Sequence, residues 1–289
     1  MSTAHWVALA TTARVGGKTI TCLLAHFGSL EAILSATPEE LIRVPRVGPR
    51  TAAAIASIDL GATEAEIARL AEQDVRILTW EDAAYPPNLL RCDDAPPVLF
   101  LRGELAPAHS QAVAIVGTRQ PEERAASLAY RMGYELARRG WTIVSGLAIG
   151  VDTAAHRGAL AAGGRTLAVL GSGVLNVYPR RNRSLAGAIM GSGVVLAEVH
   201  PEAAVSPQNL IARNRITSGL SRAVIVVEAA EDSGSLSTAR RARQQGRMVF
   251  TVTGGDAGCE ELLAAGAEAL DPETIDWDAL AERLGSNGL

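Results

Sequence analysis

From residue 112 onward the chain alternates short, almost wholly apolar runs with amphipathic stretches, and this alternation most constrains the fold. The apolar runs span residues 112–117, 141–145, 166–170, 193–198, 223–228 and 248–252 and consist mainly of Val, Ile, Leu and Ala. Such runs are typical of strands buried on both faces of a parallel sheet, with helices between them. The sequence therefore predicts a Rossmann-like, doubly wound, mostly parallel α/β sheet over residues 112–272.

The segments on either side of this sheet carry other patterns. Residues 1–75 hold short stretches with helical spacing of apolar side chains, so we expect a small all-helical domain there. Residues 76–111 are rich in proline and contain two strand-like pieces, which predicts a linking segment packed on the next domain. Residues 273–289 are acidic, and we expect one helix over 275–284 and no winged-helix domain after it.

The net charge of −4 conceals a segregation of charge along the chain. Residues 112–270 carry 17 basic side chains, all of them arginine, against 13 acidic ones, whereas the segments before and after this block are acidic. An arginine-rich block inside an acidic protein indicates a local anion-binding surface.

Other classes of protein are disfavoured by the composition. The three cysteines are widely spaced, which predicts neither a disulfide framework nor a metal site and favours a reducing cytoplasm. No run approaches the roughly 18 apolar residues of a membrane span, and the first residues lack the pattern of a secretory signal. We expect no membrane association and no cofactor.

The end of the first predicted strand carries the most informative motif. Gly117, Thr118 and Arg119 stand where a dinucleotide-binding fold would carry its glycine-rich turn. Helix N-termini at such turns present unpaired N–H groups to anions, and an arginine adds a planar, permanently charged fork that suits phosphate oxygens. This corner therefore predicts a phosphate site rather than a dinucleotide site.

Polar residues follow the other predicted strands as well. Because the carboxyl ends of parallel strands meet at one edge of the sheet, we expect these residues to extend the phosphate site. Asp152 or Thr153 is expected to cap the helix after the second strand. The candidates for phosphate contact at these strand ends are Ser145, Gly146, Arg180, Arg183, Arg213, Asn214, Arg215, Ser233, Gly234 and Ser235.

The order of these motifs resembles the DNA-processing protein A (DprA/Smf) family. The resemblance rests on VAIVGTR, SGLAIGVDTAAHRGAL, TLAVLGSGVLNVYP, RNRI, GLSRAVIVVEA and SGSLSTA and covers residues 80–252 most strongly. In the preceding helical part, FGSLEAIL and ELIRVPRVGPRTAAAI resemble the family's SAM or helix-hairpin-helix domain. Arg46 replaces the first hairpin glycine there, which favours a packing role for this unit over DNA contact.

The resemblance implies a function for the chain. It implies a cytoplasmic, non-catalytic protein that binds single-stranded DNA without sequence preference and protects incoming DNA during natural transformation. It also implies loading of the RecA recombinase and a homodimer formed through the Rossmann-like domain. Because Tyr178 is the nearest aromatic residue and stands alone, we expect base stacking to contribute little and affinity to fall steeply with salt.

An enzymatic alternative comes from the loop after the last strand. The segment GGDAGCEEL is similar to the GGxGTxxE signature of nucleoside-monophosphate phosphoribohydrolases of the lysine-decarboxylase-like Rossmann family. In that alternative Glu260 or Glu261 would act with an arginine to cleave an N-glycosidic bond. Cys259 in place of threonine and a one-residue insertion depart from the signature.

Overall fold

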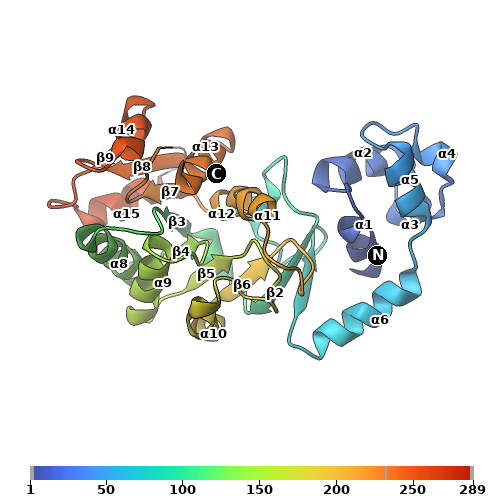
Figure 1. The fold of residues 1–289 in the computed structure, drawn as a ribbon, viewed down its shortest axis with the longest axis horizontal. Helices are drawn as coiled ribbons and strands as arrows, with labels where there is room; N and C mark the ends of the chain where they lie inside the picture. Colours follow the sequence, from blue (N-terminus) through green and yellow to red (C-terminus); the bar gives the residue numbers. More distant parts are fainter. Residues whose placement is uncertain (1–2, 232, 287–289) are drawn as a thin grey trace.

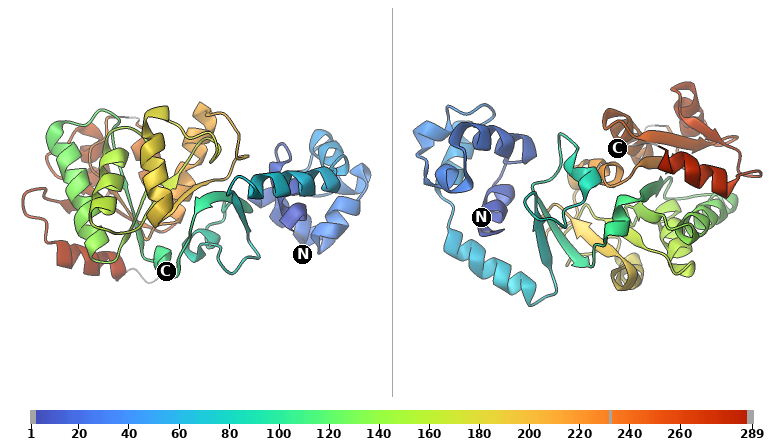
Figure 2. Two further views of the ribbon diagram at one scale, coloured as in Figure 1. Left: turned by 90° about the horizontal axis from the view of Figure 1, so that it is seen from below. Right: turned by 180° about the vertical axis from the view of Figure 1, so that it is seen from behind.

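The computed structural model describes residues 3–231 and 233–286 and contains a helical unit beside a larger α/β unit (Figure 1). The last helix of the helical unit leads toward the first strands of the sheet (Figures 1 and 2). Within the described residues, no helix is both long enough and apolar enough to cross a membrane.

The N-terminal unit has six helices among the residues that the structure describes. They are α1 (Thr3–Thr11), α2 (Gly17–Phe27), α3 (Leu30–Ser35), α4 (Pro38–Leu41), α5 (Pro49–Ala56) and α6 (Leu60–Ala71). Several begin at side chains that accept hydrogen bonds from otherwise unpaired helix N–H groups, as Ser29 does for α3 and Asp59 for α6. At α4, Thr37 and Glu40 form a reciprocal capping box. Short capped helices of this kind match the helical spacing in the sequence.

Over the described part of the chain, the α/β unit is built on one sheet of nine strands, in the order β1-β2-β6-β5-β4-β3-β7-β8-β9. The strands are β1 (Arg76–Thr79), β2 (Val98–Gly103), β3 (Ala112–Val116), β4 (Thr142–Ser145), β5 (Thr166–Val169), β6 (Val194–Ala197), β7 (Ala223–Val226), β8 (Met248–Val252) and β9 (Glu268–Leu270). Strands β3 to β9 are parallel, whereas β1 and β2 are antiparallel additions beside β6. The predicted fold class, a mostly parallel Rossmann-like sheet after a helical domain, is confirmed.

Helices cover both faces of the sheet. The remaining helical elements are α7 (Pro87–Leu90), η1 (Pro107–Ser110), α8 (Glu123–Arg138), α9 (Val151–Ala161), η2 (Arg180–Asn182), α10 (Arg183–Ser192), α11 (Pro207–Ala212), α12 (Asn214–Gly219), α13 (Gly234–Gln244), α14 (Ala257–Ala264) and α15 (Trp277–Gly285). Side chains of alternate residues along one strand lie on opposite faces of the sheet. Val113 and Ile115 pack against α8, α9 and α15, whereas Ala112 and Ala114 belong to the core beneath α12 and α13.

All six predicted strands of the parallel sheet are present, each within one or two residues of its expected ends. The two strand-like pieces of the proline-rich segment are β1 and β2, which extend the sheet on the side of the helical unit. The sequence did not indicate β9, because only three residues pair there. The expected helix over 275–284 is α15, which packs against α8.

Glycines allow helices α8 and α9 to pack closely. A Cβ on Gly133 would collide with the backbone carbonyl of Ala155, and one on Gly158 would collide with that of Tyr130. Beside this contact, His156 is fully buried, and its Nδ1 lies 2.7 Å from the hydroxyl of Thr166, which itself donates to Ile143 O. Burial lowers the pKa of His156 to about 3, so the ring is neutral and structural.

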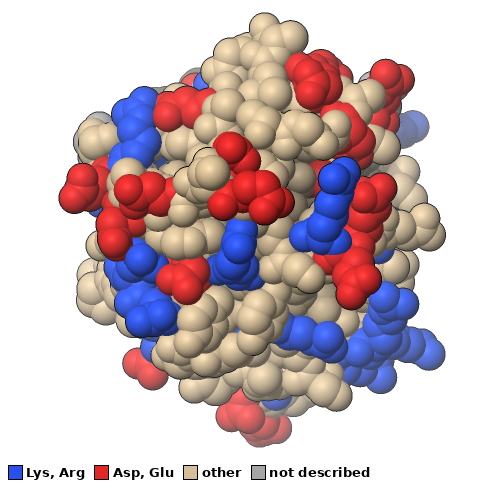
Figure 3. All heavy atoms as spheres, turned by 90° about the vertical axis from the view of Figure 1, so that its left-hand side faces the viewer, with Lys and Arg blue, Asp and Glu red and all other residues tan. Residues whose placement is uncertain are grey.

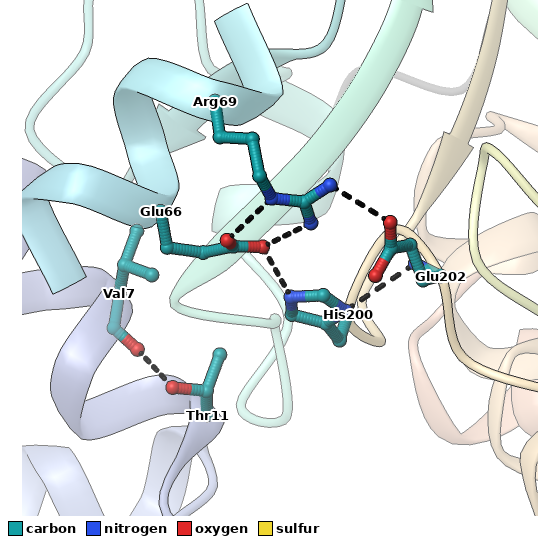
Figure 4. Close-up of polar contacts among 6 residues, drawn as sticks. All are labelled: Val7, Thr11, Glu66, Arg69, His200 and Glu202. Atoms are coloured by element: carbon teal, nitrogen blue, oxygen red, sulfur yellow. Dashed lines mark hydrogen bonds and ion pairs between the residues drawn. The ribbon is translucent and has the colours of Figure 1, made fainter. Parts of the chain in front are cut away.

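Polar contacts attach helix α6 to the loop after β6 (Figure 4). Arg69 pairs with Glu66 at 2.7 Å and with Glu202 at 2.9 Å. His200 Nδ1 accepts a hydrogen bond from the Glu202 N–H, so the neutral ring carries its proton on Nε2, 3.0 Å from Glu66. The hydrogen bonds from Arg69 hold the pKa of Glu66 below its usual value despite partial burial. These contacts join the helical unit to the sheet.

We expect Gly133→Ala to destabilise the protein because its methyl group would force α8 away from α9. Overpacking of this kind costs about 1–3 kcal/mol, which a lower midpoint in urea-induced unfolding would report. Gly187→Ala in α10 is the matched control, since a Cβ there meets nothing within 4 Å. Alanine is the better helix former, so the control should be neutral or stabilised by up to about 1 kcal/mol. Equal midpoints for the two variants would contradict the close contact.

Candidate functional site

A pocket of about 310 Å³ opens at the carboxyl ends of β3 and β4, where the chain enters α12 and α13. It lies beside the point where the strand order reverses, since β4 and β7 flank β3. The pocket is lined by Val116, Gly117, Thr118, Arg119, Gly146, Ala148, Asp152, Leu210, Ile211, Arg213, Asn214, Thr217, Ser233, Gly234, Ser235 and Thr238.

Most of the predicted phosphate-binding residues meet at this pocket. Segments that are far apart in the sequence converge here because each one follows a parallel strand or begins a helix at the same edge. The nine predicted residues in its lining are Gly117, Thr118, Arg119, Gly146, Arg213, Asn214, Ser233, Gly234 and Ser235. Four others, Ser145, Arg180, Arg183 and Arg215, are absent from the lining.

Arg213 lies against the backbone of Gly146. A Cβ at position 146 would fall on the guanidinium, so only glycine leaves room for this side chain. The guanidinium donates from Nη1 to Val169 O at 2.6 Å, while the rest of its planar fork borders the pocket. Because the side chain is half-buried, desolvation lowers the pKa of Arg213, and the charge of Asp152 opposes that shift.

Asp152 is a pocket residue that the sequence analysis placed in another role. Instead of capping α9, its carboxylate accepts hydrogen bonds from the N–H groups of Gly146 and Ala148, at 3.0 and 3.2 Å. The predicted cap is wrong for Thr153 too, because its hydroxyl donates back to Ala148 O. Burial raises the pKa of Asp152, whereas Arg213 and the two N–H groups lower it. The carboxylate therefore shapes the loop that receives Arg213.

The second cation of the pocket is Arg119. Its side chain is exposed and has no hydrogen bond or ion pair with any residue that the structure describes. Arg119 lies near enough to Arg213 for its charge to lower the pKa of that group further, after the larger effect of burial. Two guanidinium groups that repel each other across a pocket are a site that an anion would stabilise.

Hydroxyl groups and a helix start complete the pocket. Helix α13 begins at Gly234, so its first N–H groups face the lining formed by Ser233 and Ser235. Asn214 fixes this start by donating to Gly234 O at 3.1 Å. The hydroxyl of Thr217 is buried in the lining and has no partner among the described residues. It lies four residues after Arg213, a helical spacing that would have indicated it.

The structure gives two of the predicted residues other partners. The Ser145 side chain is fully buried and donates to Ile115 O at 2.7 Å, which joins β4 to β3. Arg215 points away from the pocket and pairs with Glu198 at 2.6 Å. The two arginines of the RNR motif diverge because residues two positions apart project from different faces of a helix. Ser145 and Arg215 therefore do not line this pocket, and contact of either residue with DNA stays a prediction.

Arg180 and Arg183 are exposed beside the pocket rather than in it. Between them, the buried Asn182 donates to Leu147 O at 2.8 Å and to the hydroxyl of Thr153 at 2.9 Å. This amide ties η2 to the loop between β4 and α9, the same loop that receives Arg213. The two arginines thus flank the loop, and their contact with a ligand remains a prediction.

A second pocket, of about 460 Å³, lies at the ends of β7 and β8 beside α8. Its lining includes Glu228, Gly254, Gly255 and Asp256, but neither carboxylate of the enzymatic alternative. Glu260 is exposed, and Glu261 pairs with Arg240 at 3.1 Å. The geometry therefore gives the glycosidic-cleavage alternative no support.

The excess of arginine in the α/β unit does not cover its whole surface. Figure 3 views the molecule from the end opposite the helical unit, and acidic and basic side chains are interspersed there. The described residues contain no group of three or more His, Cys, Asp or Glu side chains that could hold a metal ion. Two cations, Arg119 and Arg213, line the pocket at the ends of β3 and β4.

Comparisons with known proteins agree with the fold and with the family resemblance. The sequence pattern described as DNA recombination-mediator protein A matches residues 76–280, and a helix-hairpin-helix pattern matches residues 7–58. The chain is 36% identical to protein Smf of Synechocystis over 277 residues, which are 92% of this chain and 70% of that protein. It is 37% identical to the DNA processing protein DprA of Bacillus subtilis, over 75% of each chain.

Solved structures give the same result. The X-ray structure of DNA processing protein A from Streptococcus pneumoniae matches with a TM-score of 0.82 at 31% identity, over 98% of both chains. A Helicobacter pylori DNA processing protein A, described with a single-stranded DNA binding mode, matches with a TM-score of 0.65 at 28% identity over 74% of this chain and 97% of that one. The family resemblance is confirmed, and the chain belongs to the DNA recombination-mediator protein A family.

Proposed function

We propose that this protein binds single-stranded DNA by its phosphates at the pocket between β3, β4 and α13. The observation that carries the proposal is the pair of guanidinium groups, Arg119 and Arg213, beside the start of α13. The H. pylori relative, a protein described as binding single-stranded DNA, supports the same ligand for this fold. Arg180 and Arg183, exposed next to the pocket, would continue the contact along the strand.

We propose that binding is independent of base sequence. The pocket presents cations, hydroxyls and helix N–H groups, which recognise phosphate oxygens and carry no code for base edges. Tyr178 is 44% exposed, so one aromatic ring is available near Arg180, too few for a continuous stacking platform. Phosphate contact would then supply most of the affinity.

We propose further that the protein acts without catalysis, in the cytoplasm, to protect incoming strands during natural transformation and to help load the RecA recombinase. A homodimer through the Rossmann-like domain belongs to the same proposal. Support comes from the family assignment and from relatives named DNA processing protein. The position of Glu260 and Glu261 outside the second pocket supports the non-catalytic role.

Arg119→Ala should weaken binding of oligo-dT about ten- to a hundredfold, because one charge-assisted phosphate contact is worth about 1.5–3 kcal/mol. Fluorescence anisotropy at low salt measures the affinity. Arg157→Ala is the matched control, since Arg157 is an exposed arginine of α9 outside the pocket lining. Equal affinities for Arg119→Ala and the parent protein would refute the pocket assignment.

The salt dependence of the same titration reports how many DNA phosphates the protein neutralises. For a single strand, the slope of log K against log salt is about −0.7 for each phosphate neutralised. We expect a steep slope for the parent and a shallower one for Arg119→Ala, by about one phosphate. A flat slope in the parent protein would show that binding does not depend on phosphate.

Gly146→Ala should also lower the affinity, because the added methyl group occupies the place of the Arg213 guanidinium. The expected loss is on the order of tenfold, similar to the effect of removing one charged hydrogen bond. Gly187→Ala is the control, as it adds a methyl group to a helix without touching other atoms. Unfolding midpoints for both variants separate a binding defect from a stability defect. Unchanged affinity in folded Gly146→Ala protein would exclude Arg213 as a ligand.

A further inference from the structure

A third hollow, of about 580 Å³, lies where the helical unit meets the proline-rich segment. The contact is close, since a Cβ on Gly17 would lie 2.6 Å from Ala95 O. Helix α2, the turn between α4 and α5, and residues 80–95 all contribute to the walls. The lining comprises Lys18, Thr21, Cys22, Arg46, Trp80, Leu90, Arg91, Cys92, Asp93 and Ala95.

Three cations from three separate segments meet at this hollow. Lys18, Arg46 and Arg91 are exposed, and none has a hydrogen bond or ion pair from its side chain to any residue in the described part of the chain. Asp93 is the one acidic residue of the lining, which leaves a net charge of +2. Unpaired cations that gather around one hollow favour an anion within it.

Arg46 occupies a position that favours glycine. Its φ of 71° lies in the left-handed region, which costs a residue with a side chain roughly 1–2 kcal/mol. A helix-hairpin-helix carries glycine in such a turn, and we expected its replacement to favour a packing role for the helical unit over DNA contact. Arg46 is exposed and borders the hollow beside Lys18. The replacement adds a charge to this surface rather than an apolar contact to the core.

Helix α12 connects this hollow with the phosphate pocket. Its first residue, Asn214, lines the pocket, and its last, Gly219, lies against Cys92 and Leu89. Asn88 donates to Leu220 O at 3.1 Å, which fixes the segment to the end of the helix. The six residues of α12 span about 9 Å, and the helix runs from the pocket to Cys92, a residue of the hollow's lining.

We propose that the hollow between α2, Arg46 and residues 90–95 is a second phosphate site for the same DNA strand. The strand would leave the pocket at Arg119 and Arg213 and place a later phosphate among Lys18, Arg46 and Arg91. The half-buried indole of Trp80 forms one wall of the hollow. This inference rests on the proposed function, because it extends the path of the strand bound there.

The test compares two oligo-dT lengths: the shortest that saturates the phosphate pocket and one several times longer. The variant Arg46→Gly/Arg91→Ala removes two charges from the hollow, and glycine adopts the backbone of position 46 without strain. We expect the long strand to bind on the order of tenfold more weakly, with a salt slope shallower by about 0.7 for each phosphate that is no longer neutralised. Affinity for the short strand should be unchanged.

Arg14→Gly is the matched control for losing an exposed arginine charge and for placing glycine at a position with positive φ. Arg14 is also an exposed arginine of the helical unit with a positive φ, 68°, but it lies outside the hollow. We expect it to leave both affinities unchanged. If the double variant binds the long strand as tightly as the parent does, or if Arg14→Gly weakens it equally, the second site is overturned.

Three further outcomes distinguish a free anion from a DNA phosphate and the second site from the proposed function. If inorganic phosphate binds at the hollow and the parent shows no preference for the longer strand, the site holds a free anion and the strand assignment is wrong. If the parent binds neither oligonucleotide, the proposed function fails and the second site fails with it. If the parent binds both strands and only the double-variant prediction fails, the proposed function stands without the second site.

Discussion

The contact between Arg213 and the backbone of Gly146 organises the site. It requires a loop without a side chain at that position, and the Asp152 carboxylate supplies that loop shape by accepting from two of its N–H groups. Asn182 braces the same loop from the other side by binding Leu147 O. Three separate segments thus fix one half-buried guanidinium, while the exposed Arg119 needs no such support. Removing water from a cation is costly, and these neighbours offset that cost.

The sequence predicted the fold and the edge that carries the site because both follow from periodicity. Apolar runs such as 112–117 identify buried parallel strands, and the edge follows from the rule that ligands bind beyond their carboxyl ends. Gly117, Gly146 and Gly234 could be assigned to one pocket on that ground alone. The sequence could not place β9, where three residues pair without a strong apolar signal.

Side-chain direction was the part that the sequence could not supply. Ser145 and Gly146 are adjacent in the chain. The Ser145 hydroxyl nevertheless donates a hydrogen bond inside the sheet, whereas the backbone of Gly146 lines the pocket. Arg213 and Arg215 are two residues apart, and one borders the pocket while the other pairs with Glu198. Asp152 was assigned to a helix cap because local spacing allows it, but its partners lie in the preceding loop. Such choices depend on tertiary neighbours.

The antiparallel pairing of β2 with β6 has a consequence for synthesis of the chain. Phe100 lies opposite Ala197, so β2 leaves the ribosome long before the strand that it must join. Until β6 is made, β2 can pair only with β1, and an isolated two-stranded ribbon is only marginally stable. The helical unit can fold early, but its attachment to the sheet must wait for the middle of the α/β unit. The first-made end of this protein is therefore among the last to reach its final position.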